Sequence, residues 1–390
     1  MRSALPDLAT GICEYSPTGS LGTTGFLGTT GFLGTTGFLG TTVSLESSVD
    51  PDQSSTYREV SKEPFDIRYV DGTHATGTYM QDTLAFGDSI MLSNLTMAVV
   101  DKMGQGHTGG MGIMGIASNA GEAAVEEGAR AYPNFMDSMV EQKLIASKTY
   151  SLDIGGRGAQ SGSILFSGYD TSRMEGNFSL LPVQPLAGRT AYFAIPLTSL
   201  TLTDNDGTRA IGAGSELNLT AELDSGTSLT YVPVSLFHQL VTYFNAHSCH
   251  GTTCLVSCDV ANWNGSLNYQ FAGGVDRLWI SVPFSELAVP MPLQDGADPN
   301  FADRHEVCIF GLSASGSNDR YLFGDTFLRS AYVFHDLDNN QVGIAPVASE
   351  SSAKSSHIVT TTHGHGGATT TATSVTSATV STNINTWRRT

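Results

Sequence analysis

Residues 217–228 of this 390-residue chain read LNLTAELDSGTS, and this stretch decides how the rest is interpreted. From Leu217 to Asp224 apolar residues alternate with polar ones, a period of two that predicts a β-strand with one apolar and one polar face. Asp224 ends the polar face. Gly226 then permits a tight turn, in which nearby hydroxyls and amides can hydrogen-bond a carboxylate. An ordinary turn that begins at an aspartate has the same pattern, so a structural and a catalytic interpretation both stay open here.

Composition favours a β-rich protein around this stretch. Only 14% of the residues are charged, 40% are hydrophobic and 43 are glycine. Long exposed helices normally carry more charge than this. Short apolar runs at 163–166 and 197–202 end in Gly or Asp and predict strands, whereas only 133–144 and 234–244 look helical. We therefore expect an all-β protein.

Charge and cysteine usage narrow the functional class. The net charge is −18 with only 19 Lys and Arg, so we expect no nucleic-acid partner. No apolar run is long enough to cross a membrane. Five cysteines and four Asn-x-Ser/Thr sequons favour a secreted or cell-surface location, with disulfides and N-glycans. The opening residues contain no apolar core of a signal peptide, so we expect the natural start to lie upstream. The sequons begin at Asn94, Asn177, Asn218 and Asn264.

Two segments differ from the globular body. Residues 21–42 contain three copies of Leu-Gly-Thr-Thr-Gly-Phe. Three six-residue copies are too few to stack a β-solenoid, so local duplication in a surface loop is the better interpretation. From residue 349 onward Ser, Thr, Ala, Gly and His dominate, and such a segment cannot bury enough apolar area to offset its ordering entropy. We predict a disordered tail over 348–390.

Six motifs occur in the order that one family shows. Asp224-Ser225-Gly226-Thr227-Ser228 closely resembles the second active-site motif of pepsin-like aspartic endopeptidases, of the type that fungi secrete or hold at the cell surface. Residues 65–73 (FDIRYVDGT) resemble the flap hairpin of this family. Two further motifs, 112–116 (GIMGI) and 322–329 (LFGDTFLR), resemble the segments that lie behind its active-site loops. The last two, 162–170 and 195–197, resemble the junction of its lobes.

The resemblance implies a two-lobed all-β fold with the active-site cleft between the lobes. The implied domains are an N-terminal lobe over 1–194, incomplete at its start, with a flap around 65–84, and a C-terminal lobe over 195–347. Asp224 is the implied catalytic residue. Tyr69 can also be explained as a half-buried strand aromatic, and the following hairpin turn favours the flap. The implied substrate-contacting residues are Tyr69, Asp71, Gly72 and Thr73 on the flap and Gly226, Thr227 and Ser228 beside Asp224.

In this family two aspartates hold a water molecule and share one proton, because two adjacent carboxylates do not both ionise easily. The ionised aspartate takes a proton from the water as it attacks, and the protonated one donates to the peptide carbonyl. The resemblance therefore implies an endopeptidase that acts on proteins or peptides at acid pH. It requires no metal or other cofactor, and we expect a monomer.

The chain departs from the family pattern in two ways. Only one Asp-[Ser/Thr]-Gly-[Ser/Thr] motif is present, and the upstream candidate at 17–20 reads PTGS. We expect the first aspartate to precede Met1, so this chain should be nearly inactive by itself. A catalytically dead homologue that binds peptides, or a structural cell-surface glycoprotein, would also fit. Glu222, where an apolar residue is usual, should raise the pKa of Asp224.

The clustered cysteines allow two interpretations. His247, His250 and their neighbouring cysteines resemble a metal cluster, but the spacing fits no common zinc finger, and disulfides are favoured in an oxidising compartment. The family resemblance implies a Cys258–Cys308 disulfide, which leaves Cys249 and Cys254 as a local pair and Cys13 unpaired. A Gly-rich run at 104–109 fits GxGxxG, but no helix follows, so a nucleotide site is not favoured.

Overall fold

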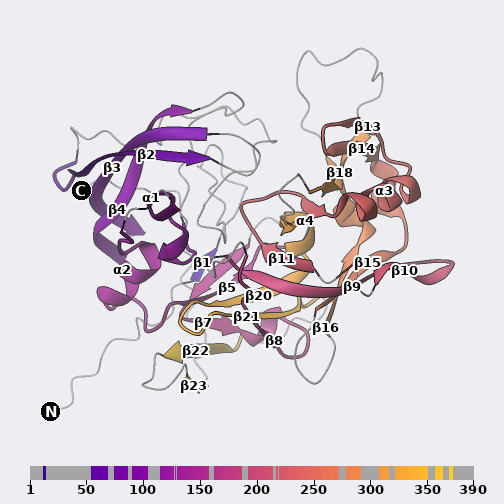
Figure 1. The fold of residues 1–390 in the computed structure, drawn as a ribbon. Helices are drawn as coiled ribbons and strands as arrows, with labels where there is room; N and C mark the ends of the chain where they lie inside the picture. The colour runs from indigo at the N-terminus through magenta and orange to yellow at the C-terminus, as the bar shows by residue number, and fades with distance from the viewer. Residues whose placement is uncertain are drawn as a thin grey trace.

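A computed structural model gives the fold. Two β-rich halves flank a central six-stranded sheet, with β2, β3 and β4 in one half and β11, β18 and helix α3 in the other (Figure 1). The structure describes residues 12–14, 54–68, 74–86, 90–103, 115–126, 128, 130–157, 162–186, 192–213, 217, 219–271, 278–290, 307–315, 321–349, 356–362 and 369–371.

The six-stranded sheet joins segments that are far apart in the sequence. Its strand β5 pairs with β20, with Tyr150 opposite His335. Residues 331–346 were expected in the second lobe, but they pair here with β5 and β8 from the first half of the chain. This sheet therefore contains strands from both expected lobes, and the division at 194 stays a prediction. Its order is β1 (Ile12–Glu14), β6 (Ser163–Phe166), β5 (Thr149–Asp153), β20 (Ala331–Asp336), β21 (Gln341–Pro346) and β8 (Ser179–Pro182).

An eleven-stranded sheet forms most of the second half within the described residues. The predicted strand before Asp224 is β11, which pairs antiparallel with β9 on one side and parallel with β19 on the other. The sheet comprises β13 (His247–His250), β14 (Thr253–Ser257), β18 (Val307–Ala314), β12 (Thr230–Val232), β19 (Tyr321–Phe323), β11 (Leu219–Leu223), β9 (Ala194–Asp204), β15 (Ser266–Phe271), β16 (Leu278–Pro283), β10 (Gly207–Ala213) and β17 (Ala288–Pro290).

The other half carries a three-stranded antiparallel sheet, β2 (Arg58–Arg68), β3 (His74–Phe86) and β4 (Ile90–Met103). The two predicted helices are confirmed as α2 (Phe135–Glu141) and α3 (Val234–Tyr243). Helix α2 begins with a capping box between Asn134 and Asp137, in which each side chain accepts from the other's backbone N–H. The remaining helical elements in the described ranges are α1 (Ala123–Glu126), α4 (Asp325–Leu328) and the 3₁₀ turns Asn119–Gly121, Thr171–Arg173, Cys258–Asn262 and Phe284–Leu287.

Part of the predicted tail is ordered. Residues 356–362 include β22 (Ile358–Thr362), which pairs with β7 (Gly168–Asp170) and with β23 (Thr369–Thr371). Ile358 and Val359 are buried, and the carboxylate of Asp170 accepts hydrogen bonds from this segment. The prediction of disorder over 348–390 is wrong for 356–362. The edge of β7 supplies hydrogen-bond partners for the backbone of this segment, and composition alone does not reveal such a partner. None of the helices in the described part of the chain has the length and apolar composition needed to span a membrane.

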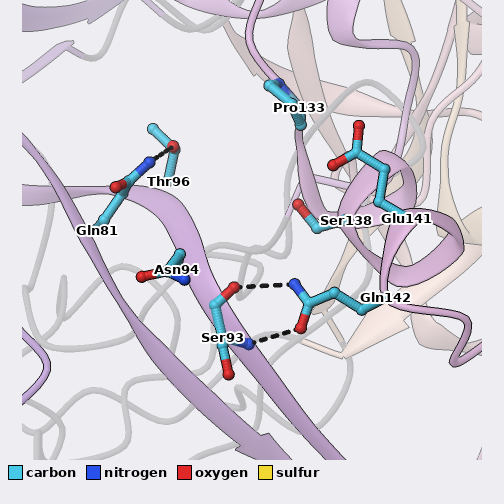
Figure 2. Close-up of a pocket in the computed structure, with 8 residues that line it drawn as sticks. All are labelled: Gln81, Ser93, Asn94, Thr96, Pro133, Ser138, Glu141 and Gln142. Atoms are coloured by element: carbon cyan, nitrogen blue, oxygen red, sulfur yellow. Dashed lines mark hydrogen bonds between the residues drawn. The ribbon is translucent and has the colours of Figure 1, made fainter.

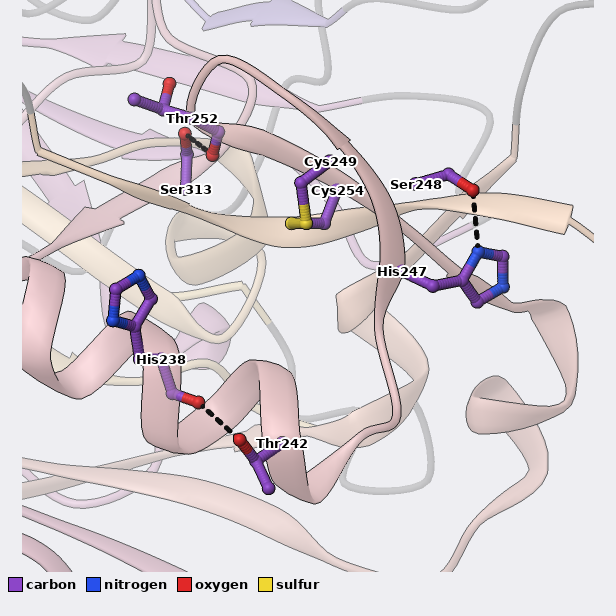
Figure 3. The surroundings of a disulfide bond; sticks show 8 residues. All are labelled: His238, Thr242, His247, Ser248, Cys249, Thr252, Cys254 and Ser313. Carbon is purple, nitrogen blue, oxygen red and sulfur yellow. Dashed lines mark hydrogen bonds between the residues drawn. A yellow bond between two sulfur atoms is a disulfide. The ribbon is translucent and has the colours of Figure 1, made fainter.

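Two disulfides lie in the second half, and they join Cys249 to Cys254 and Cys258 to Cys308. Figure 3 shows the first, which links β13 to β14 beside His247. A cysteine held in a disulfide has no thiolate to offer a metal. Among the residues described, no group of three or more His, Cys, Asp or Glu side chains could hold a metal ion. The side chain of Cys13 lies outside the described residues.

Candidate active site

Asp224 lies directly after β11, at the end where this strand runs beside β19. Its backbone N–H donates to the carbonyl of Phe323 at 3.1 Å. Its side chain is only 6% exposed. The N–H of Gly226 donates to Oδ1 at 2.8 Å, and the hydroxyl of Thr227 donates to Oδ2 at 2.6 Å. Both carboxyl oxygens are thus oriented by hydrogen bonds from their own turn.

The loop of residues 224–228, the candidate active-site loop, rests on the start of helix α4. The N–H of Asp325 donates to the carbonyl of Thr227 at 2.8 Å, and the N–H of Thr326 donates to that of Ser228 at 3.2 Å. The hydroxyl of Thr326 also donates to the carbonyl of Gly311 at 2.8 Å on β18. The loop is therefore held by backbone contacts from a segment almost one hundred positions later in the chain.

Gly324 makes this close packing possible. Its φ of −89° suits any residue, so space is the constraint. A Cβ here would lie 2.1 Å from the carbonyl oxygen of Thr227 and 2.5 Å from that of Leu229. We expect Gly324→Ala to lower the free energy of unfolding by about 1–3 kcal/mol, since overpacking displaces the backbone. Chemical denaturation measures it. Gly156→Ala is the control, because a Cβ there meets no atom within 4 Å. Equal stability of the two variants would contradict the prediction.

Asp325 is a functional candidate that the sequence motifs did not single out. The residue is 3% exposed. Burial raises its pKa to about 7, with Arg329 acting in the opposite direction and the charges of Asp224 and Glu286 adding to the increase. The guanidinium of Arg329 lies 3.7 Å from Oδ2. The signal in the sequence was the position of Asp325 directly after Gly324, in the segment expected behind the active-site loop.

A buried aromatic cluster lies on the six-stranded sheet near Asp224. The ring of His335 stacks on Tyr150 with centroids 4.4 Å apart, and it meets the ring of Phe193 edge-on, also at 4.4 Å. Burial raises the pKa of Tyr150 well above its ordinary value, and the charge of Asp224 adds to that shift. Neither the hydroxyl of Tyr150 nor either ring nitrogen of His335 has a hydrogen-bond partner among the residues that the structure describes.

Glu222 differs from the sequence expectation. The alternating pattern assigned it to the polar face of a half-exposed strand, but its side chain is fully buried. Its backbone lies in β11 between Ala194 of β9 and Leu322 of β19. Both faces of this strand are covered, since Ala221 and Leu223, which alternate with Glu222, are buried as well. Its expected influence on the pKa of Asp224 stays a prediction.

The structure brings only part of the predicted site together. Gly226 is exposed, and Thr227 and Ser228 are half-buried beside Asp224. Strands β2 and β3 pair as far as Arg68 and His74, the residues that flank the predicted flap tip. Of the predicted glycosylation sites, Asn94, Asn177 and Asn264 are exposed. The predicted site residues outside the described part of the chain are Tyr69, Asp71, Gly72, Thr73 and Asn218.

Sequence comparison shows which known proteins this chain is similar to. Residues 38–347 match a family model described as eukaryotic aspartyl protease. A probable aspartic-type endopeptidase, opsB, of Aspergillus fumigatus is 37% identical over 300 residues, which cover 76% of this chain and 58% of that protein. Candidapepsin-3 of Candida albicans is 31% identical over 316 residues, covering 77% of this chain and 67% of that protein. The chain thus spans little more than half the length of the Aspergillus relative.

A solved structure supports the fold. The aspartic proteinase from Irpex lacteus aligns with a TM-score of 0.64, covering 89% of this chain and all of that one. Sequence identity is 17%, so the likeness concerns the fold alone. It agrees with the two-lobed all-β architecture that the motifs predicted.

Proposed function

This chain belongs to the eukaryotic aspartyl protease family, and from that premise we propose that the natural protein is an endopeptidase that cleaves proteins at acid pH, with Asp224 as one of two active-site aspartates. The observation that carries the proposal is the geometry of Asp224. Its carboxyl group ends a buried strand, and Gly226 and Thr227 hold both oxygens. A plain turn aspartate has no need of this burial and orientation.

In the proposed mechanism the pair of aspartates holds a water molecule between the lobes. One carboxylate takes a proton from the water as it attacks the peptide carbon, and the other, protonated, donates to the carbonyl oxygen. The hydrogen bonds from Gly226 and Thr227 keep the carboxyl plane of Asp224 fixed while its charge changes. The proton belongs to the pair rather than to either residue. Tyr69, Asp71, Gly72 and Thr73 are proposed to cover the substrate as a flap, and Ser228 lies beside the site.

Asp325 supports an acid working range. With a pKa raised to about 7 by burial, its carboxyl group is mostly protonated in acid and mostly ionised above neutrality. Ionisation there places a second negative charge near Asp224. Like charges disfavour one another's ionised form, so the electrostatics of the site change above neutral pH.

Location and partners follow from the same proposal. Two disulfides suit an oxidising compartment, and a relative from Candida albicans carries the name secreted aspartic protease 3. We propose a secreted, cell-surface or cell-wall protein that acts as a monomer on extended protein or peptide substrates.

An acid proteolysis assay tests the function. The 390-residue chain and any longer product of the same gene are incubated with an unfolded protein at acid and neutral pH, and fragments are mapped by mass. We expect internal cleavage in acid by the form with two active-site aspartates, and at most residual cleavage by a form with Asp224 alone. The reason is that acid and base roles need both carboxyl groups.

The single Asp-Ser-Gly-Thr motif favours one alternative, a catalytically dead homologue that binds peptides. A folded two-aspartate form that binds unfolded protein without cutting it would overturn the enzymatic proposal and support this alternative. Robust cleavage by the 390-residue chain would instead mean that another carboxyl group completes the pair.

A further inference from the structure

Strand β4 carries a bulge at one of the predicted sequons. Asp82 of β3 pairs with Leu95 and Leu84 pairs with Leu92, so Ser93 and Asn94 together lie opposite the single residue between. Asn94 has a φ of 52°, in the left-handed region that asparagine tolerates better than most residues. A bulge of this kind re-aims a side chain out of the regular alternation. Asn94 is exposed as a result.

Helix α2 locks this bulge in place. The N–H of Ser93 donates to Oε1 of Gln142 at 3.0 Å, and Nε2 of Gln142 donates to the carbonyl of Ser93 at 2.9 Å. Figure 2 shows this two-point pairing of one carboxamide with one residue's backbone. The side chain thus replaces the ladder hydrogen bonds that the bulge removes, and it ties β4 to the C-terminal end of α2.

A groove of about 480 Å³ opens beside Asn94. Its volume is within the usual range for small-ligand sites, roughly 300–1,000 Å³. In Figure 2 the side chains of Asn94, Gln81 and Thr96 lie on the strand side and those of Ser138 and Glu141 on the helix side. Hydroxyl, carboxamide and carboxylate groups therefore line this groove, together with a similar amount of apolar surface. Such groups suit a ligand with many hydroxyls and an amide, which is the chemistry of an N-acetylated sugar.

We propose that Asn94 carries an N-linked glycan and that its first N-acetylglucosamine lies in this groove. The sequon is Asn94-Leu95-Thr96. Nδ2 of Asn94 forms the bond to C1 of the sugar and loses one proton, while the lipid pyrophosphate of a lipid-linked oligosaccharide donor leaves. The inference rests on the secretory route proposed above.

The other described sequons lack this arrangement. Asn264 is exposed, but its Nδ2 donates to Oδ1 of Asn205 at 3.0 Å. Asn177 is exposed next to Gly176, and neither residue lines the groove. A glycan on Asn177 would therefore extend into solvent, which makes that site a natural internal reference for the one at Asn94.

Site mapping in a eukaryotic secretory host tests the proposal. The secreted protein is analysed by intact mass and by peptide mapping, beside Asn94→Gln and the conservative Thr96→Ser. We expect one core glycan to disappear in Asn94→Gln and to remain in Thr96→Ser. An unmodified Asn94 in secreted, folded protein overturns the proposal. Failure of the protein to be secreted at all would instead count against the secretory route, so the two proposals fail in distinguishable ways.

A second measurement tests the groove. An amidase that removes N-glycans is applied to folded protein, and we expect release at Asn94 to be about tenfold slower than at Asn177, a factor typical of one modest contact. The difference should vanish after unfolding, and it should shrink in Gln142→Ala, which frees the bulge. Equal release rates from the folded protein would show a glycan that does not occupy the groove, and would overturn that part of the proposal.

Discussion

Replacing Asp224 by Asn is expected to lower acid proteolysis by about 10²- to 10⁴-fold, the contribution that general acid–base catalysis typically makes. Asparagine keeps the shape of the side chain and can still accept at one oxygen from Gly226 or Thr227. It cannot exchange a proton with water, so the pair loses its shared proton. Initial rates on an unfolded protein substrate, measured on the gene product that cleaves in acid, give the effect.

The matched control is Asp259→Asn, which makes the same chemical change at an exposed carboxylate of the same half of the protein. Its rate and its unfolding transition should equal those of the parent. Asp224→Asn should also unfold cooperatively, because the turn that holds it stays intact. If Asp224→Asn cleaves as fast as Asp259→Asn, then Asp224 is a structural turn residue and the proposed mechanism is wrong.

The second large effect concerns stability in acid and originates at His335. Burial lowers the pKa of His335 from its ordinary value of 6.5 to about 3. Protonation therefore favours the unfolded chain: stability from this group is complete above pH 6.5 and is lost as the pH falls toward 3. With about 1.4 kcal/mol per pKa unit, the loss at roughly pH 4 amounts to about 3 kcal/mol.

His335→Phe should recover this loss. A phenyl ring preserves packing between Tyr150 and Phe193 and has no group that titrates. We expect the stability difference between variant and parent to grow by about 3 kcal/mol from roughly pH 8 to pH 4, as measured by chemical denaturation. His238→Phe, the same change at an exposed histidine, is the matched control. A difference that is constant with pH would mean that His335 does not titrate between its folded and unfolded states.

Local patterns in the sequence were enough for several features. The alternation before Asp224 predicted a strand that ends at this aspartate, and β11 ends one residue before it. The helical periods at 133–144 and 234–244 also produced helices α2 and α3. These succeeded because strand and helix periods, caps and turns depend on neighbouring residues, whose order the sequence states directly.

Burial and long-range pairing were decided by the tertiary structure. Glu222 has the pattern of a half-exposed strand position, yet it is buried, as are Ala221 and Leu223 on the opposite face of the strand. The pKa of Asp325 is raised and that of His335 is lowered mainly because elements distant in the sequence bury both side chains. Segment 356–362, polar by composition, orders by adding a strand to β7. Each outcome depends on which remote segment supplies the covering surface or the strand edge, and no local pattern in the sequence contains that information.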